Sequence, residues 1–78
     1  MNTIVRHYKG QHYRILHIAD HTETREKCVV YEQLYKNKYP YGYVWVRPYD
    51  MFHKTMIYKN QCVNRFEQIN EKQSKMNE

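Results

Sequence analysis

Short β-rich runs, some of which alternate between apolar and polar positions, recur along this chain, and turn-forming residues separate the runs. Alternation with a period of two is typical of a β-strand that buries one face. The pattern predicts five strands, at residues 4–9, 13–19, 27–35, 43–47 and 63–69. Short strands at this spacing favour a small barrel or sandwich over a parallel α/β unit. We therefore predict a mostly β fold, a small SH3-like barrel of about five strands with one short helical turn.

The segments between the runs indicate how the strands are joined. Residues 20–26 form a polar stretch, so the second and third strands should make a hairpin. A second loop is expected at 36–42. Pro48 suits the first turn of a helix, because proline has no N–H to leave unpaired there, and predicts a short helical turn through Phe52. Residues 59–61 predict a tight turn near the C-terminal end.

Size and composition limit the kind of binding site that this fold can build. The 78 residues suffice for one domain, predicted at 1–69, followed by a polar tail at 70–78. Nine tyrosines, one tryptophan and two phenylalanines must supply much of the core. Aromatic side chains suit a thin β core because they bury a large area and keep a polar edge at the surface. A shallow groove is therefore expected rather than an enclosed pocket.

Charge and cysteine usage suggest the compartment and the class of partner. The net charge of +5 is compatible with an anionic partner such as nucleic acid, and equally with a merely basic soluble domain. No apolar stretch approaches the length of a membrane-spanning helix, and the N-terminal residues lack the apolar run of a signal peptide. We expect a cytoplasmic protein without a membrane partner. Cys28 and Cys62 form no Cys-x-x-Cys pair and should be reduced and at least partly buried.

Several short motifs follow one another in a fixed order along residues 5–69. They are Arg-His-Tyr-Lys-Gly at 6–10, Tyr-Arg-Ile-Leu at 13–16, His-Thr-Glu-Thr at 21–24, Val-Val-Tyr at 29–31, Leu-Tyr at 34–35, Trp-Val-Arg-Pro at 45–48, Met-Phe at 51–52 and Arg-Phe at 65–66. In these motifs the chain resembles the DUF1653 family, small bacterial domains of unknown function. The resemblance implies a compact β domain in a bacterial cytosol, and it implies no activity.

Histidines and carboxylates near the predicted hairpin loop raise the question of metal binding or catalysis. His17, Asp20, His21 and Glu23 carry suitable ligand atoms, but a strand end and loop need not bring them together. We therefore expect no metal and no cofactor. His7, His21 and Glu23 are polar residues of the family motifs, and a histidine beside a glutamate can act as general acid and base. No nucleophile motif accompanies them, so loop-forming hydrogen bonds remain the plainer interpretation.

Residues 43–47 supply the best candidate for a binding surface. Along an extended strand, Tyr43, Trp45 and Arg47 point to one side, while Val44 and Val46 point to the other. We predict that the valines enter the core and that the aromatic and arginine side chains face outward, as ligand-binding residues. Tyr31, Tyr35 and the tyrosine-rich loop would border this groove. The alternative is that Trp45 is a core residue and that Arg47 pairs with Glu32 or Asp50.

The residues thus predict a binding module without catalytic residues, more readily than an enzyme. Its ligand would be a peptide or a small anionic or nucleotide-like molecule, held by the candidate residues His7, His21, Glu23, Tyr31, Tyr35, Trp45 and Arg47. One alternative is a single-stranded nucleic-acid-binding protein that uses base stacking and basic residues such as Lys36 and Lys38. A second alternative is a small enzyme that uses His21 and Glu23. The oligomeric state is left open.

Overall fold

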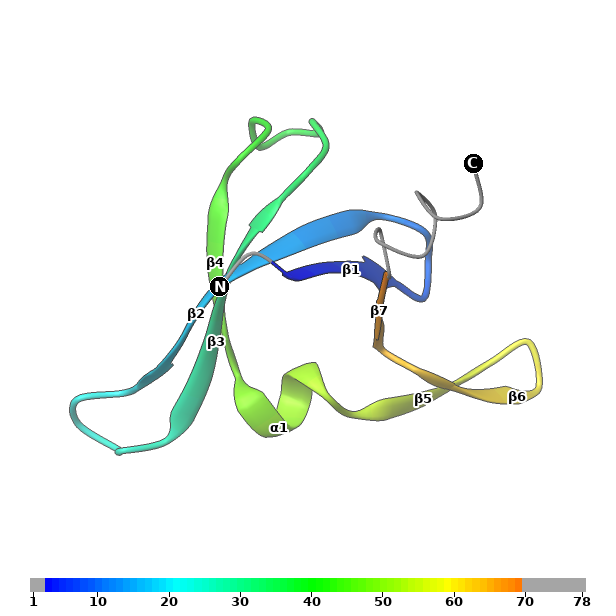
Figure 1. Cartoon of the computed structure of the whole chain (residues 1–78). Coiled ribbons are helices and arrows are strands. Elements are labelled where there is room, and N and C mark those ends of the chain that lie inside the picture. The colour runs from blue at the N-terminus through cyan, green and yellow to red at the C-terminus, as the bar shows by residue number, and fades with distance from the viewer. Residues whose placement is uncertain (1–2, 70–78) are drawn as a thin grey trace, which may run out of the picture.

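The computed structural model describes residues 3–69 and is mostly β (Figure 1). The strands are β1 (Thr3–His7), β2 (His12–Asp20), β3 (Lys27–Gln33), β4 (Val44–Pro48), β5 (Thr55–Tyr58), β6 (Gln61–Asn64) and β7 (Phe66–Gln68). One short helix, α1 (Tyr49–Phe52), follows β4. The mostly β fold and the helical turn after Pro48 are therefore confirmed. Residues 70–78, predicted as a polar tail, lie outside the described residues.

Five of the strands form one antiparallel sheet in the order β4-β3-β2-β1-β7, and β5 and β6 form a separate two-stranded sheet. In Figure 1 this second hairpin extends away from the main sheet beyond α1. Within residues 3–69, β4 and β7 are the two ends of the main sheet and do not pair with each other. The sheet thus remains open there, and a closed barrel of the predicted kind is not seen.

The turns follow their local sequences. The hairpin predicted between the second and third strands is confirmed, because β2 ends at Asp20 and β3 begins at Lys27. The turn predicted near residues 59–61 is also present: Tyr58 pairs with Gln61, and Lys59 and Asn60 both have positive φ. Two consecutive residues with positive φ suit a two-residue hairpin, because such a turn matches the twist of its strands.

The single strand predicted at 63–69 is instead two strands in different sheets. Arg65 separates them: its N–H donates to the carbonyl of Lys54, and its carbonyl accepts from the N–H of Tyr8. These two bonds hold the chain where it leaves β6 of the hairpin and enters β7 of the main sheet. Apolar residues occur on both sides of the break, at Val63 and at Phe66, so their presence alone does not mark it.

The core lies on one face of the main sheet, which we call the inner face. Its buried residues are Val5, Ile15, Val29, Tyr31 and Phe52, with Tyr13, Trp45 and Phe66 packed against them. Phe52 from α1 stacks on Phe66 with 4.1 Å between ring centroids, and it meets the edge of Tyr31 at 5.3 Å. The helix therefore contributes the side chain that links β3 to β7 across the inner face.

Strand β4 corrects the central prediction from the sequence. Val44 and Val46 are 50% and 63% exposed, whereas Trp45 is half-buried against the core. The expectation that the valines enter the core and the indole faces outward was wrong. The cause is the register with β3: Trp45 lies opposite the buried Tyr31, and directly paired residues share a face of the sheet. The predicted alternation of side chains along β4 is present, but the face predicted to be buried is the exposed one.

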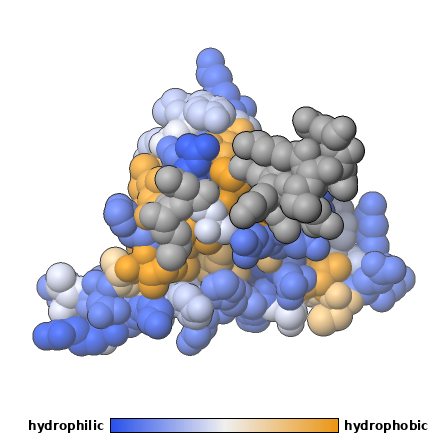
Figure 2. All heavy atoms as spheres, viewed as in Figure 1, coloured by the Kyte–Doolittle hydropathy of each residue, from blue (hydrophilic) through white to orange (hydrophobic). Residues whose placement is uncertain are grey.

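The remaining expectations concern cysteines and the surface. Neither cysteine is in a disulfide; Cys28 is buried, but Cys62 is exposed, so the prediction that both are at least partly buried was wrong for Cys62. Figure 2 shows hydrophilic atoms over much of one face of the molecule, with hydrophobic atoms in separate patches. Within residues 3–69 no helix has the length and apolar character needed to cross a membrane.

Candidate functional site

A small groove opens on the inner face where β3 and β4 meet the loop between them. Its volume is about 200 Å³, and we call it the aromatic groove. It is lined by Tyr13, Tyr31, Gln33, Tyr35, Asn37, Tyr39, Trp45 and Arg47. Register explains the arrangement, because Tyr13 faces Gln33 and Tyr31 faces Trp45 across neighbouring strands. Strand pairing therefore gathers side chains that are up to 34 positions apart, from Tyr13 to Arg47, into one site.

Gln33 is a buried polar residue of the groove, only 1% exposed, and its side-chain amide connects the loop to Trp45. Its Nε2 lies 3.0 Å from the Tyr35 carbonyl, 3.1 Å from Asn37 Oδ1, 3.1 Å from the Tyr39 carbonyl and 3.3 Å from the Pro40 carbonyl. Its Oε1 accepts a hydrogen bond from Trp45 Nε1 at 3.0 Å. A buried amide needs such partners, because an unpaired polar group is costly in the core. One side chain thus anchors both the loop and the indole.

Arg47 is the charged residue of the aromatic groove. Its guanidinium carbon lies 5.8 Å from the centroid of the Phe66 ring, within the range of a cation–π contact. Among residues 3–69 it makes no ion pair, and Glu32, one of the partners considered from the sequence, pairs with Arg14 at 3.3 Å. Arg47 therefore brings a positive charge to the groove without a carboxylate that neutralises it.

Phenol groups add hydrogen-bond donors beside this arginine. The hydroxyls of Tyr13 and Tyr35 lie 2.5 Å apart. Burial raises the pKa of Tyr13, and the neighbouring Tyr35 raises it further. Burial also raises the pKa of Tyr31, although the nearby Arg47 opposes this effect. Both phenols therefore stay neutral at physiological pH and can donate to an anion.

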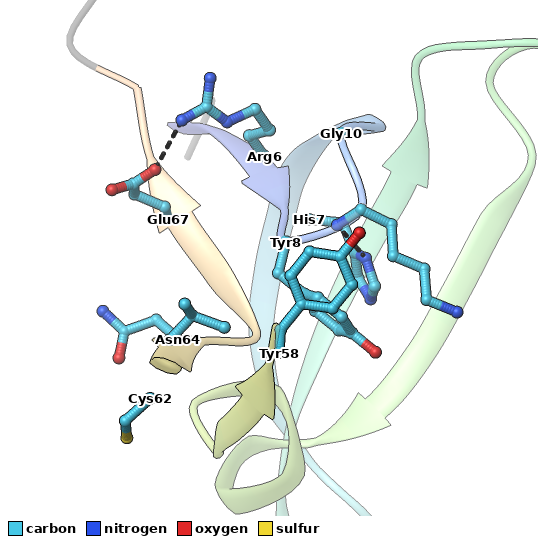
Figure 3. Close-up of a pocket in the computed structure, with 10 residues that line it drawn as sticks. Arg6, His7, Tyr8, Gly10, Tyr58, Cys62, Asn64 and Glu67 are labelled. Atoms are coloured by element: carbon cyan, nitrogen blue, oxygen red, sulfur yellow. Dashed lines mark hydrogen bonds and ion pairs between the residues drawn. The ribbon is translucent and has the colours of Figure 1, made fainter. Parts of the chain in front are cut away.

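A second and larger groove lies between the β1–β2 turn and the β5–β6 hairpin (Figure 3). It has a volume of about 560 Å³ and is bounded by Tyr8, Tyr58 and Cys62 among others. Arg6 and Glu67 cross its rim as an ion pair of 2.8 Å, and both side chains are largely exposed. Arg6 thus has a carboxylate partner, which Arg47 lacks within residues 3–69, while Lys9 is a further cation of this lining.

His7 lies between the two grooves. It lines the larger one, and its ring contacts Phe66 at 5.0 Å and Tyr13 at 6.5 Å between centroids. The backbone N–H of Lys9 donates to its Nδ1 at 3.2 Å, which requires that nitrogen to be unprotonated. Burial lowers the pKa of His7, and the positive charges of Arg47, Arg65 and Lys9 lower it further. His7 is therefore a neutral imidazole in a positively charged environment.

The free energy of unfolding should decrease when the pH falls below about 6.5, the ordinary pKa of histidine. The unfolded chain protonates His7 at that pH, whereas the fold keeps it neutral, so the unfolded state binds more protons. The contribution of neutral His7 to the free energy of unfolding is fully present above pH 6.5. It is lost as the pH falls through the lower pKa that His7 has in the folded state. Urea denaturation of wild type and His7→Gln across pH 5–8 measures this. Equal pH slopes in the two proteins would contradict it.

His21 and Glu23 lie at the other end of β3, in the loop that joins it to β2. His21 Nδ1 accepts from the N–H groups of Glu23 and Thr24, and the Glu23 carboxylate accepts from Thr22. Both side chains are exposed, and neither lines either groove. The structure therefore separates these two candidates from Tyr31, Tyr35, Trp45 and Arg47, which it brings together. His21 Nδ1 also lies 3.8 Å from a Glu23 carboxylate oxygen, so the contacts of both residues are local to this loop.

Tyr13 and Gln33 line the groove but were not singled out from the sequence. Gln33 occupies the same alternating face of β3 as Val29 and Tyr31, so an amide at a core position was the signal available. Nothing in the sequence placed Tyr13 across from it, because the pairing of β2 with β3 decides that contact. Within residues 3–69 no three histidine, cysteine, aspartate or glutamate side chains come together as a metal site would require.

Comparison with known proteins identifies the family. The model of the DUF1653 family, described as a protein of unknown function, matches residues 3–68. A crystal structure of a DUF1653 protein from Bordetella bronchiseptica is 30% identical, with a TM-score of 0.79 over 90% of this chain and 87% of that chain. No curated protein sequence matches. The match at residues 3–68 confirms the resemblance seen in the motifs, and the chain belongs to the DUF1653 family.

Proposed function

We propose that this domain is a binding module that holds a small anionic group in the aromatic groove. The observation that carries the proposal is the position of Arg47, which faces a groove of aromatic rings and has no carboxylate partner in the described part of the chain. Arginine binds carboxylate and phosphate through two parallel hydrogen bonds, and a guanidinium without a carboxylate partner can do so.

The surroundings of Arg47 support an anion rather than a neutral ligand. The neutral phenols of Tyr31 and Tyr13 can donate hydrogen bonds next to the guanidinium. Lys36 and Lys38 are exposed on the loop that borders the groove, and the ammonium of Lys38 lies 5.5 Å from the Tyr39 ring. These positive charges raise the local concentration of anions.

The size of the groove limits what can enter it. About 200 Å³ is below the usual 300–1,000 Å³ of sites for drug-sized molecules, so the ligand inserts one ring or one charged group. Tyr39 and Trp45 meet edge to face at 5.0 Å, and Tyr43 packs against both rings. A planar group that carries a carboxylate or phosphate fits these walls, whether it is a free molecule or part of a longer one.

Fluorescence titration tests the proposal, because Trp45 is the single tryptophan and lies in the groove. We expect benzoate, adenosine monophosphate or inorganic phosphate to change its emission in the wild type. Arg47→Ala should weaken that response about ten- to hundred-fold, since a hydrogen bond to a charged group contributes about 1.5–3 kcal/mol. Arg47→Lys keeps the charge but cannot form two parallel hydrogen bonds. Its affinity for these anions should therefore lie between that of the wild type and that of Arg47→Ala.

Arg14→Ala is the matched control, because Arg14 pairs with Glu32 and does not line the groove. It should titrate like the wild type. An equal loss in Arg14→Ala and Arg47→Ala, or no response to any of these probes, would refute the proposal. Binding of a thymidine oligonucleotide that disappears at high salt, with no response to the small anions, would favour single-stranded nucleic acid as the ligand instead.

A further inference from the structure

Strand β4 is an end strand of the main sheet and has β3 as its one neighbouring strand within residues 3–69. The N–H of Gln33 donates to the carbonyl of Tyr43, so the backbone of Gln33 faces β4. Backbone groups alternate along a strand, so Tyr31 and Val29 also face β4, where they bond to Trp45 and Arg47. The N–H and C=O groups of Val44 and Val46 consequently point away from β3, towards the free edge.

The side chains along this edge do not protect it. Val44 and Val46 are the exposed valines on the outer face, so apolar surface adjoins their free backbone groups. Natural edge strands are usually blunted by charged side chains, bulges or proline. In β4 such residues come at the C-terminal end of the strand, where Arg47 is charged and Pro48 lacks an N–H. Val44 to Val46 therefore form a short unprotected stretch that another strand can extend.

The charged side chains beside β4 indicate the charge that a partner strand should carry. Lys36 and Lys38 are exposed on the loop that leads into the strand. At the other end the ammonium of Lys27 lies 5.1 Å from the ring of Tyr49, which directly follows β4. Asp50 and Asp20, which lies opposite Lys27 in the β2–β3 ladder, are opposing charges at that end, and Glu32, opposite Val44, is paired with Arg14. Lys36 and Lys38 at the start of the edge complement an acidic partner, and the net charge of +5 disfavours a second copy of this chain.

We infer that the free edge of β4 is a docking site for an extended acidic peptide segment, which adds to the sheet as a further strand. Its apolar residues alternate, so that one set covers Val44 and Val46 on the outer face. Acidic residues occupy the other positions and the ends, where they meet the lysines. This inference does not depend on the proposed function, because the edge and its valines lie outside the aromatic groove.

Amide hydrogen exchange, followed by NMR, tests strand addition with a defined probe. The probe is a fluorescein-labelled nine-residue peptide of alternating glutamate and valine. We expect saturating peptide to slow exchange of the Val44 and Val46 amides at least ten-fold. The amides of Trp45 and Arg47 already bond to β3 and should change little. Binding should also weaken as salt rises, because the lysines contribute to it. Unchanged exchange at Val44 and Val46 would overturn the inference.

Substitutions at Val46 separate backbone pairing from other effects. Val46→Pro removes the outward N–H and leaves the ladder with β3 intact, so fluorescence anisotropy should show peptide affinity reduced at least ten-fold. Val46→Thr keeps the N–H and the branched shape and should change affinity less than three-fold. Should the proline variant fail to fold, Val46→Glu brings a repelling charge to the same place and should give the same loss. Ile57→Glu, at a 74% exposed position on the β5–β6 hairpin, is the control for added charge.

The outcomes distinguish the possible occupants. Equal peptide affinity in the wild type, Val46→Pro and Val46→Glu would overturn the docking site. Concentration-dependent dimerisation in sedimentation, abolished by Val46→Pro, would show that a second copy is the occupant and would also overturn it. A Trp45 response to benzoate that persists in Val46→Pro, together with lost peptide binding, would support the edge as a site separate from the aromatic groove.

Discussion

Gln33→Glu is expected to lower the free energy of unfolding by about 3–5 kcal/mol at pH 7, the cost typical of an uncompensated buried charge. The substitution replaces the Nε2 of Gln33, a donor, by a carboxylate oxygen. That oxygen would face the oxygens of Tyr35, Asn37, Tyr39 and Pro40, all within 3.3 Å of the present nitrogen. Repulsion should release the loop, and the emission of Trp45 should shift to the red as its surroundings become wetter. Urea denaturation and fluorescence measure both effects.

The pH dependence of this variant provides a second measurement. Burial raises the pKa of the introduced carboxyl group above its unfolded value of about 4.3, so the destabilisation grows as the pH rises from there. Near pH 4 the protonated group can again donate one hydrogen bond, and much of the stability should return. Gln61→Glu, the same change at the exposed first position of β6, should alter stability by less than about 0.5 kcal/mol. Equal losses in the two variants would contradict the role given to Gln33.

Phe52→Ala is expected to destabilise the fold by about 3–5 kcal/mol, the usual cost of removing a buried aromatic ring. Phe52 is 1% exposed and joins Tyr31 to Phe66 across the inner face. A core of this size rarely contributes more than about 3–5 kcal/mol, so the variant should be largely unfolded at room temperature. Circular dichroism and the dispersion of the amide NMR spectrum report this directly.

The neighbouring Met51 provides the control for the short helix α1. It is 42% exposed, so Met51→Ala should leave the urea midpoint nearly unchanged. Phe52→Leu keeps much of the volume and should lose less stability than the alanine variant does. If Phe52→Ala unfolds at the same urea concentration as Met51→Ala, the ring is not the link between α1 and the sheet that the structure indicates.

The local elements of this fold could be predicted from the sequence. Strand positions follow from alternation, the β2–β3 hairpin from a polar loop, and the helical turn from Pro48. Each of these depends on residues that are close together in the chain. The break at Arg65 could not be predicted in this way, because it depends on bonds to Lys54 and to Tyr8, and Tyr8 is far away in sequence.

The candidate site shows the same division between local and long-range information. Tyr31, Tyr35, Trp45 and Arg47 were predicted to share a groove, and they line one. Their face was predicted wrongly, since Val44 and Val46 appeared to be the natural core residues of a strand in which aromatic residues alternate with them. His21 and Glu23 were grouped with the site because they are polar and belong to a motif. The length of β3 separates them from it.

The sequence by itself determined the mostly β class, the hairpins, the family and the fact that Trp45 and Arg47 share one face of a strand. These properties follow from the period of two along each strand and from turn chemistry, which are local. Only the tertiary structure decided which face is buried, that Gln33 holds the loop, and that Arg47 lies among tyrosines of other strands with no carboxylate partner within residues 3–69. Alternation shows which side chains of a strand share a face, but it does not show which of the two faces is buried. The register against β3, set by the packing of Val29 and Tyr31, decides which face turns inward.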